Sequence, residues 1–416
     1  MIIKMTNKLR NWKIIIIIQA ILIGALFSFI PFAIFDKFGL TKIWFFLLVP
    51  TSMFFFTPLW AKVKKKKSNT FILKINSFFL FIFLSLLMTV NFFDNNKLII
   101  YFYPLLLFCT GMFVAGMVPF SMEIIRSYTS EHQLKTNPTL YFILGSVVTI
   151  IISFLIQYFL TELTAKISLQ GYFSLLALIN FSLIFFNHDI QTKEITFKIN
   201  PNSWKVLQKN KQFWSYLYSS SFLYSINEVF GYILPILIFN NTAIIIIMIG
   251  SLYVIRKISY LFGYLLINNN NIKHQIICNT IIAIIAIALL LGLTIAFFPF
   301  QTQLSHILYL TIGLGGSQIL IGCCLGHLSR IQKNNIINLV GTEHLTLGLM
   351  IEHVFGHAIF SLLLGIIIIP VIITFYTNIL TYIIIYSIII GMLFLSFIFI
   401  FNKLPVKKNR VLGFNI

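Results

Sequence analysis

The chain carries little charge of either sign, and very little of it is negative. Of its 416 residues only 10 are aspartate or glutamate, against 30 lysines and arginines, while 59% of the residues are hydrophobic. A soluble protein of this size would have too few polar side chains to cover its surface. The composition therefore excludes an ordinary soluble protein and indicates a chain that lies mostly within a membrane.

Cysteine and the common catalytic motifs are also scarce. The four cysteines, Cys109, Cys278, Cys323 and Cys324, all fall in long apolar runs, where cysteine behaves as a small hydrophobic residue. They do not form the pattern of a disulfide framework. The sequence contains no glycine-rich phosphate loop and no serine nucleophile elbow. We therefore expect no cofactor, no ATP-driven transport by this chain alone and no enzyme activity.

Twelve apolar runs are long enough to cross a bilayer, which takes roughly 20 residues. Backbone groups in lipid must be hydrogen-bonded within their own segment, so each run is expected to be a helix. The first run has no small-residue cleavage site after it and is interpreted as a spanning helix rather than a signal peptide. The predicted spans are 14–35, 43–61, 71–93, 98–125, 140–161, 168–187, 213–239, 242–267, 275–299, 304–327, 345–370 and 377–402.

A polar stretch with five lysines, residues 188–212, has six of these runs before it and six after it. We therefore predict an all-α integral membrane protein with twelve transmembrane helices in two six-helix halves, residues 1–187 and 213–416. Residues 188–212 are predicted to form a cytoplasmic linker between them.

The basic residues predict the orientation. If the N-terminus is cytoplasmic, 26 of the 30 lysines and arginines are assigned to the cytoplasmic side, counting Lys74, Arg256 and Lys257 inside the spans. This bias predicts an even number of spans with both termini inside, in what we expect to be a bacterial inner membrane. It also explains the net charge of +20 without a nucleic-acid partner, so the expected partners are the lipid bilayer and a small molecule.

The twelve spans and the stretch that follows the second span resemble the major facilitator superfamily. That superfamily has a glycine, an aspartate and a basic run between spans two and three. Here the sequence reads Pro58-Leu-Trp-Ala-Lys-Val-Lys-Lys-Lys-Lys67, with Pro58 at the glycine position and Lys62 at the aspartate position. The resemblance implies secondary transport by two related halves. Lys62 is a candidate gating position. The family forms an ion pair with the aspartate at this position, and here a lysine replaces that aspartate.

Parts of the second half resemble the bacterial sugar efflux transporters. The matching positions are Asn227, Leu234-Pro235, Met248-Ile-Gly250, Ile321-Gly322 and Gly341-Thr342. The resemblance implies export of a small polar organic solute such as a sugar, which we expect to be proton-coupled and carried out by a monomer. The alternatives are drug or metabolite efflux or uptake by the same fold, uncoupled facilitation, and a membrane enzyme that does not transport.

Ionisable groups inside the spans are the candidates for chemistry, because burying one costs a few kcal/mol or more. Glu228 lies near the middle of the seventh span beside Asn227. A desolvated carboxyl group favours its protonated form, so Glu228 could carry a proton, with Asn227 as a residue of the substrate cavity. The structural alternative is a protonated Glu228 that hydrogen-bonds a neighbouring helix.

The eleventh span holds three further candidates, Glu352, His353 and His357. His353 and His357 have the i, i+4 spacing of metal ligands, but the zinc-protease motif requires a glutamate after the first histidine, and here Glu352 precedes it. No metal is expected. Glu352 and His353 lie about 100° apart on a helix. Each is a candidate for proton coupling or for a polar contact between helices.

Arg256 and Lys257 interrupt the eighth span. Adjacent side chains cannot both extend in one direction, so we expect Lys257 to reach the inner interface and Arg256 to pair with Glu228 or Glu352 or to attract substrate. Glu123 and Arg126 are read as an ion pair near the inner end of the fourth span. Gln318, which follows the small residues Gly313-Leu-Gly-Gly-Ser, and Gln19 in the first span are further candidates for the substrate cavity.

Overall fold

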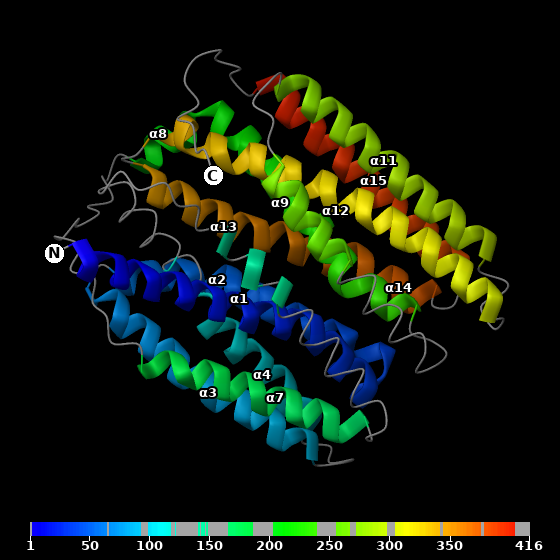
Figure 1. Cartoon of the computed structure of the whole chain (residues 1–416). Coiled ribbons are helices and arrows are strands. Elements are labelled where there is room, and N and C mark those ends of the chain that lie inside the picture. The colour runs from blue at the N-terminus through cyan, green and yellow to red at the C-terminus, as the bar shows by residue number, and fades with distance from the viewer. Residues whose placement is uncertain are drawn as a thin grey trace. The chain divides into compact units, whose positions relative to one another are not determined.

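The computed structural model describes residues 2–64, 66–92, 99–117, 121, 140–141, 143–145, 147–148, 165–185, 203–238, 255–266, 272–297, 304–341, 344–375 and 378–403. Nearly all of these residues are helical and none of them forms a strand (Figure 1). Their contacts divide the chain into two compact units. The first contains Met1–Pro201 and Leu349–Ala358, and the second contains Asn202–Gly348 and Ile359–Lys408.

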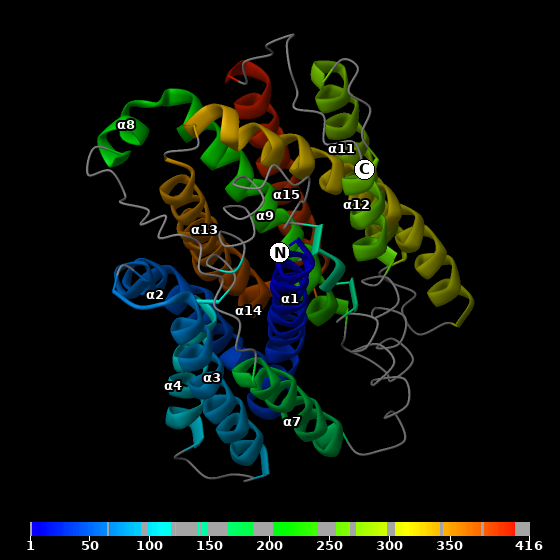
Figure 2. The ribbon, with the colours of Figure 1, turned by 60° about the vertical axis from the view of Figure 1, so that its left-hand side comes forward.

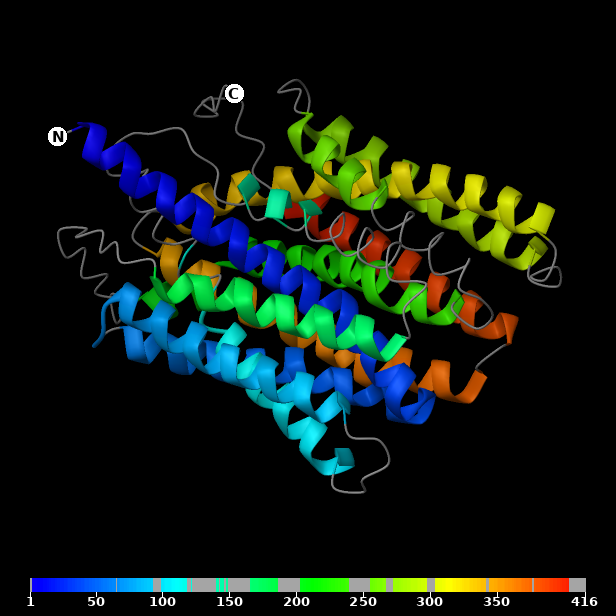
Figure 3. The ribbon, with the colours of Figure 1, turned by 60° about the horizontal axis from the view of Figure 1, so that its bottom comes forward.

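The first unit contains five long helices that the structure describes throughout. These elements, with two short 3₁₀ segments, are α1 (Ile2–Phe38), η1 (Leu40–Leu47), α2 (Leu48–Lys64), α3 (Asn69–Phe92), α4 (Ile99–Val114), α7 (Ala165–Ser182) and η2 (Leu183–Phe185). α3 lies along α7, as Figures 1 and 3 both show. Phe81 and Phe181 meet there with ring centroids 4.9 Å apart, and Asn180 Nδ2 donates to the carbonyl of Ser77.

The second unit contains α8 (Ser203–Lys209), α9 (Lys211–Ile238), a helical segment at 255–265, α11 (Ile272–Phe297) and α12 (Leu304–Val340). After α12 the chain forms α13 (Leu345–Leu362), of which Leu349–Ala358 belongs to the first unit. It continues through the π-helical turn η4 (Leu363–Ile368) into α14 (Ile369–Phe375), and α15 (Ile379–Lys403) follows. α11 packs against both α12 and α15 (Figure 2).

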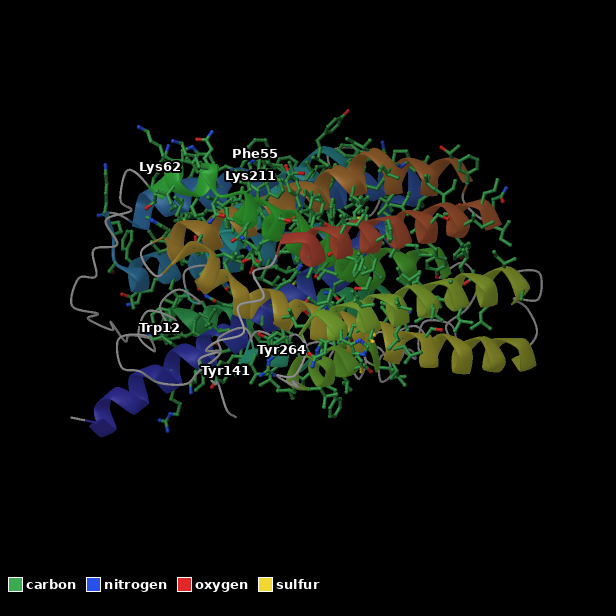
Figure 4. All side chains as sticks on the ribbon, turned by 90° about the horizontal axis from the view of Figure 1, so that it is seen from above. Trp12, Phe55, Lys62, Tyr141, Lys211 and Tyr264 are labelled. Carbon is green, nitrogen blue, oxygen red and sulfur yellow. The ribbon has the colours of Figure 1, made fainter. Side chains whose placement is uncertain are left out.

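The surface of α11 shows why these helices belong in a bilayer. Ile281, Ile285 and Leu289, spaced at i, i+4 and i+8, are each at least 50% exposed, whereas Ala283 and Ile287 on the other side are fully buried. A soluble protein rarely leaves such an apolar stripe uncovered. Phe55 on α2 is likewise 58% exposed (Figure 4).

Five helices in the described part of the chain are long and apolar enough to cross a membrane. They are Thr41–Val63, Thr70–Val90, His274–Ala296, Leu347–Phe375 and Ile379–Ile400. Each coincides with one of the predicted spans within a few residues, except that Leu347–Phe375 continues five residues past the predicted end. The chain is therefore a multi-pass membrane protein.

Two helices extend beyond the membrane spans that were predicted for them. α12 continues to Val340 instead of ending near 327, and α1 begins at Ile2 instead of near 14. At about 1.5 Å per residue, the 37 residues of α12 extend about 55 Å, well beyond an apolar bilayer core of about 30 Å. The apolar run ends at the membrane, but the helix continues until Gly341, whose φ of 72° a residue with a side chain would rarely adopt.

The second part of the predicted linker is ordered against the second unit. Ser203 Oγ lies 2.8 Å from His344 Nδ1, and Asn210 Nδ2 donates to the carbonyl of Leu339 at 2.9 Å. Asn210 Oδ1 also accepts from the backbone N–H of Phe213 at 3.0 Å, which caps the start of α9. Residues 203–210 therefore dock on the turn between α12 and α13, which the charge pattern also assigns to the cytoplasm.

Candidate functional site

The candidate site in the second unit begins with a polar stripe on α9. Ser221, Ser225 and Glu228 follow one another at i, i+4 and i+7, so they share one side of the helix. Glu228 is 8% exposed, and Asn227 Nδ2 donates to its Oε1 at 3.2 Å. Within the described residues, Ser221 Oγ, Ser225 Oγ and Asn227 Oδ1 are buried and have no hydrogen-bond partner. The stripe thus presents polar atoms inside an apolar helix.

Two buried cations accompany this acid. Arg256 is 1% exposed and Lys257 is 9% exposed, so both side chains are buried. The charge of Lys257 interacts with Glu228 and with Arg256. Lys257 therefore lies close enough to Glu228 for their charges to interact. Lys257 was expected to reach the inner interface, and in the structure its side chain is buried rather than exposed.

Two tyrosines surround the carboxylate. Tyr224 lies one turn before Glu228 on α9, and Tyr260 lies one turn after Arg256; both interact electrostatically with Glu228. The side chain of Tyr260 is also hydrogen-bonded to Ser329 of α12. Sequence reasoning missed both tyrosines, since a tyrosine in a membrane helix is usually read as packing. Their i, i+4 spacing from charged residues was the available signal.

Two glycines of α12 hold the charged segment 255–265 in place. A methyl group on Gly322 would lie 2.5 Å from the carbonyl oxygen of Arg256, and one on Gly326 would lie 2.1 Å from that of Tyr260. Only glycine permits backbones to approach so closely. Gln318 lies one turn before Gly322 and is 4% exposed.

The predicted role of the Gly313–Gln318 stretch in close helix packing is not supported at Gly316. A methyl group there would meet nothing within 4 Å. The close packing occurs at Gly322 and Gly326 instead.

The candidates on α13 belong to the first unit. Glu352 is 6% exposed and His357 is 3% exposed, whereas His353 is half-buried. The Nε2 atoms of His353 and His357 lie 3.2 Å apart, and their rings meet edge to face with centroids 4.4 Å apart. The described residues contain no group of three or more histidine, cysteine or acidic side chains able to hold a metal ion.

In the remainder of the first unit, Gln19 is completely buried on α1. Both of its amide atoms lack a hydrogen-bond partner among the described residues. Close to it, a methyl group on Gly145 would touch Ala20, and Lys13 Nζ lies 5.0 Å from the ring centre of Tyr141, which Figure 4 labels. Tyr141 and Gly145 therefore lie beside α1, with Gly145 at the level of Gln19.

The predicted gating residues have different outcomes. Lys62 is exposed near the end of α2 (Figure 4), as expected of a residue in a basic loop region. Glu123 and Arg126 lie outside the described residues. Their ion pair stays a prediction.

No family model matches the sequence, and no curated protein matches it. Solved structures, however, share its fold. A nucleoside transporter, NupG, is 16% identical, with a TM-score of 0.64 over 95% of this chain and 98% of its own. A D-xylose-proton symporter is 12% identical, with a TM-score of 0.67 over 96% and 98%.

A third solved structure, a bacterial homologue of the iron transporter ferroportin, is 11% identical, with a TM-score of 0.60 over 96% of this chain and 99% of its own. These likenesses extend over nearly the whole chain. They confirm the predicted all-helical membrane fold.

Proposed function

We propose that this chain, which has the fold of the major facilitator transporters, is a secondary transporter that exports a small polar organic solute, such as a sugar, in exchange for protons. The membrane is the bacterial inner membrane, with both termini in the cytoplasm. Glu228 is the proton carrier. The observation that carries the proposal is the burial of Glu228 beside Asn227, with the charge of Lys257 acting on it.

The charge balance of Glu228, Arg256 and Lys257 supports coupling. When Glu228 is ionised, its negative charge offsets part of the positive charge of the two cations. When Glu228 takes up a proton, that offset is lost. The repulsion between the two adjacent cations is then uncompensated in surroundings of low dielectric constant. The two protonation states therefore favour different arrangements of α9 and the 255–265 segment, and such a bias lets a proton shift a conformational equilibrium.

The polar atoms around Glu228 support an uncharged polar solute. Buried polar groups are normally hydrogen-bonded, and Ser221 Oγ, Ser225 Oγ and Asn227 Oδ1 have no such partner among the described residues. Hydroxyl and amide groups of this kind match the hydroxyl groups of a sugar. Gln318 and, in the first unit, Gln19 are the other amides that we assign to solute binding.

The test uses the purified protein in sealed vesicles with an imposed pH gradient and a panel of radiolabelled sugars and other polar solutes. For the solute that is transported, Glu228→Gln keeps the volume of the side chain but cannot titrate. We expect pH-driven flux to fall at least tenfold while solute exchange without a gradient persists. Glu352→Gln, which neutralises the other buried carboxylate that the structure describes, is the matched control and keeps pH-driven flux.

Unchanged pH-driven flux in Glu228→Gln rejects this residue as the proton carrier. Flux that never responds to pH in the wild type supports uncoupled facilitation by the same fold. Substrate turnover in detergent without vesicles would favour a membrane enzyme. The structures that share this fold speak against that alternative, since those compared above are all transporters.

A further inference from the structure

His353 and His357 form a pair on α13 that the proposed transport mechanism does not use. The two residues are one helical turn apart, and their Nε2 atoms lie 3.2 Å from each other. The ring planes are 86° apart. A helix aligns the Cβ atoms of residues at i and i+4 but does not bring these two nitrogen atoms together, because each ring can rotate about two side-chain bonds.

We propose that His353 and His357 bind one divalent transition-metal ion, of the zinc type, through their Nε2 atoms. A zinc–nitrogen bond of about 2.0–2.1 Å and a tetrahedral angle place two ligand nitrogens about 3.3–3.4 Å apart. The observed 3.2 Å differs from that separation by only a small movement of the rings. The separation of the two nitrogens therefore already matches that of a two-point ligand.

Imidazole also has the right chemistry for this class of ion. Neutral imidazole suits zinc, copper, nickel and iron, whereas magnesium and calcium prefer oxygen ligands. For both Nε2 atoms to bind, each ring must carry its hydrogen on Nδ1. A hydrogen that the two Nε2 atoms share in the absence of metal therefore moves to Nδ1 when the ion binds, and the pair keeps its charge.

The surroundings define what kind of site this is. In the described part of the chain, no third histidine, cysteine or acidic residue completes a group with the pair. Two protein ligands leave coordination positions for water or a solute, which is the arrangement of an open and exchangeable site. Val354 follows His353, so the glutamate that a zinc protease uses as its base is missing, and the site binds metal without hydrolysing peptides.

His353 and His357 differ in exposure in a way that provides access. His353 is half-buried, whereas His357 is only 3% exposed. An ion can first replace one of its bound waters with the nitrogen of His353. It can then bind the more deeply buried nitrogen of His357. The proposal depends on this geometry alone, so it holds or fails independently of Glu228 and proton coupling.

The test uses the full-length protein, free of any histidine tag, in detergent. Titration with Co²⁺ and Zn²⁺ is followed by visible absorption of bound cobalt and by calorimetry. We expect one ion per chain and a thermal unfolding midpoint that rises with Zn²⁺ and returns with chelator, but does not change with Mg²⁺. His353→Gln and His357→Gln should each weaken binding at least tenfold.

Another histidine with a neighbour at i+4 offers a matched control. His274 Nε2 lies 3.4 Å from Cys278 Sγ on α11, also at i and i+4. His274→Gln should leave the affinity for Zn²⁺ and the rise in unfolding midpoint unchanged. If His274→Gln abolishes binding while His353→Gln does not, or if the wild type binds no ion at millimolar Zn²⁺, the proposal is wrong. A variant that has lost only the site keeps its metal-free unfolding midpoint and shows no rise with Zn²⁺. A variant that has lost the fold has no unfolding transition.

Discussion

Arg330 Nη1 donates to the carbonyl oxygen of Tyr264 at 2.6 Å, and its guanidinium group lies over the ring of the same tyrosine, 5.6 Å from the ring centre. The same nitrogen also reaches the carbonyl of Leu265 at 2.9 Å. Carbonyl groups in the last turn of a helix have no partner within that helix. Arg330 on α12 therefore caps the segment 255–265 that carries Arg256 and Lys257.

Removal of this cap should destabilise the second unit. Charge-assisted hydrogen bonds contribute about 1.5–3 kcal/mol each at most, and a cation over a tyrosine adds about 0.5–1 kcal/mol. We expect Arg330→Ala to lower the free energy of unfolding by about 2–4 kcal/mol, measured by chemical denaturation in detergent. Arg330→Lys should recover only part of the loss, because an ammonium group does not reproduce the planar fit of guanidinium.

Arg10 on α1 is exposed and provides the control for removing an arginine. Arg10→Ala should change the unfolding free energy by less than about 0.5 kcal/mol. Equal effects of the two substitutions would show that Arg330 contributes only its charge.

Two glycines of α12 lie in different surroundings, so substitution of one serves as the control for substitution of the other. Gly326→Ala places a methyl group against the backbone of Tyr260 and forces the two helices apart, which costs about 1–3 kcal/mol or more. Gly316→Ala on the same helix enters open space, where alanine favours the helix by about 1 kcal/mol. Thermal unfolding should therefore move down for the first substitution and up or not at all for the second. A midpoint that falls equally for both would argue against close packing at Gly326.

The buried charges predict a specific pattern of rescue. Lys257→Gln removes a buried cation that interacts with Glu228 while Arg256 remains, so we expect a loss of up to about 3–5 kcal/mol in unfolding free energy. Adding Glu228→Gln should restore much of that loss, because no isolated charge remains at these two positions. The comparison is the same cycle with Arg256→Gln in place of Lys257→Gln.

Chemical denaturation of the single and double variants measures both cycles. Stronger coupling of Glu228 to Lys257 than to Arg256 would identify Lys257 as the partner of Glu228. If only the Arg256 cycle shows rescue, the partner of Glu228 is the arginine that the sequence pattern favoured.

The charge bias predicts which side of the membrane each loop faces. In a variant without the native cysteines, Lys205→Cys on α8 should react with an impermeant thiol reagent only after the membrane is opened. Asn95→Cys, between the third and fourth predicted spans, should react from outside in intact cells. Labelling of position 205 from outside would overturn the topology and the cytoplasmic linker. The docking of Ser203 and Asn210 on the turn between α12 and α13 then predicts that position 342 has the same sidedness as position 205.

The helical membrane fold could be predicted from the sequence because a bilayer imposes few solutions. A run of about 20 apolar residues has to be a helix in lipid, whatever surrounds it. Predicted spans such as 71–93 and 213–239 therefore agree closely with α3 (Asn69–Phe92) and α9 (Lys211–Ile238). The helix ends outside the membrane were harder to predict, because hydropathy marks the edge of the bilayer and not the end of a helix, as α12 shows.

The candidate site depended on information that the sequence does not contain. The rarity of acidic residues in the spans identified Glu228 from the sequence alone, since a buried carboxyl group must have a reason to be there. Which of two adjacent cations, Arg256 or Lys257, acts on it depends on how the 255–265 helix is rotated against its neighbours. That rotation is set by contacts between segments distant in sequence, with Gly322 and Gly326 on one side and the Arg330 cap at its end. Likewise, the spacing of His353 and His357 was visible in the sequence, but the 3.2 Å between their nitrogens came only from packing, which selects one orientation of each ring.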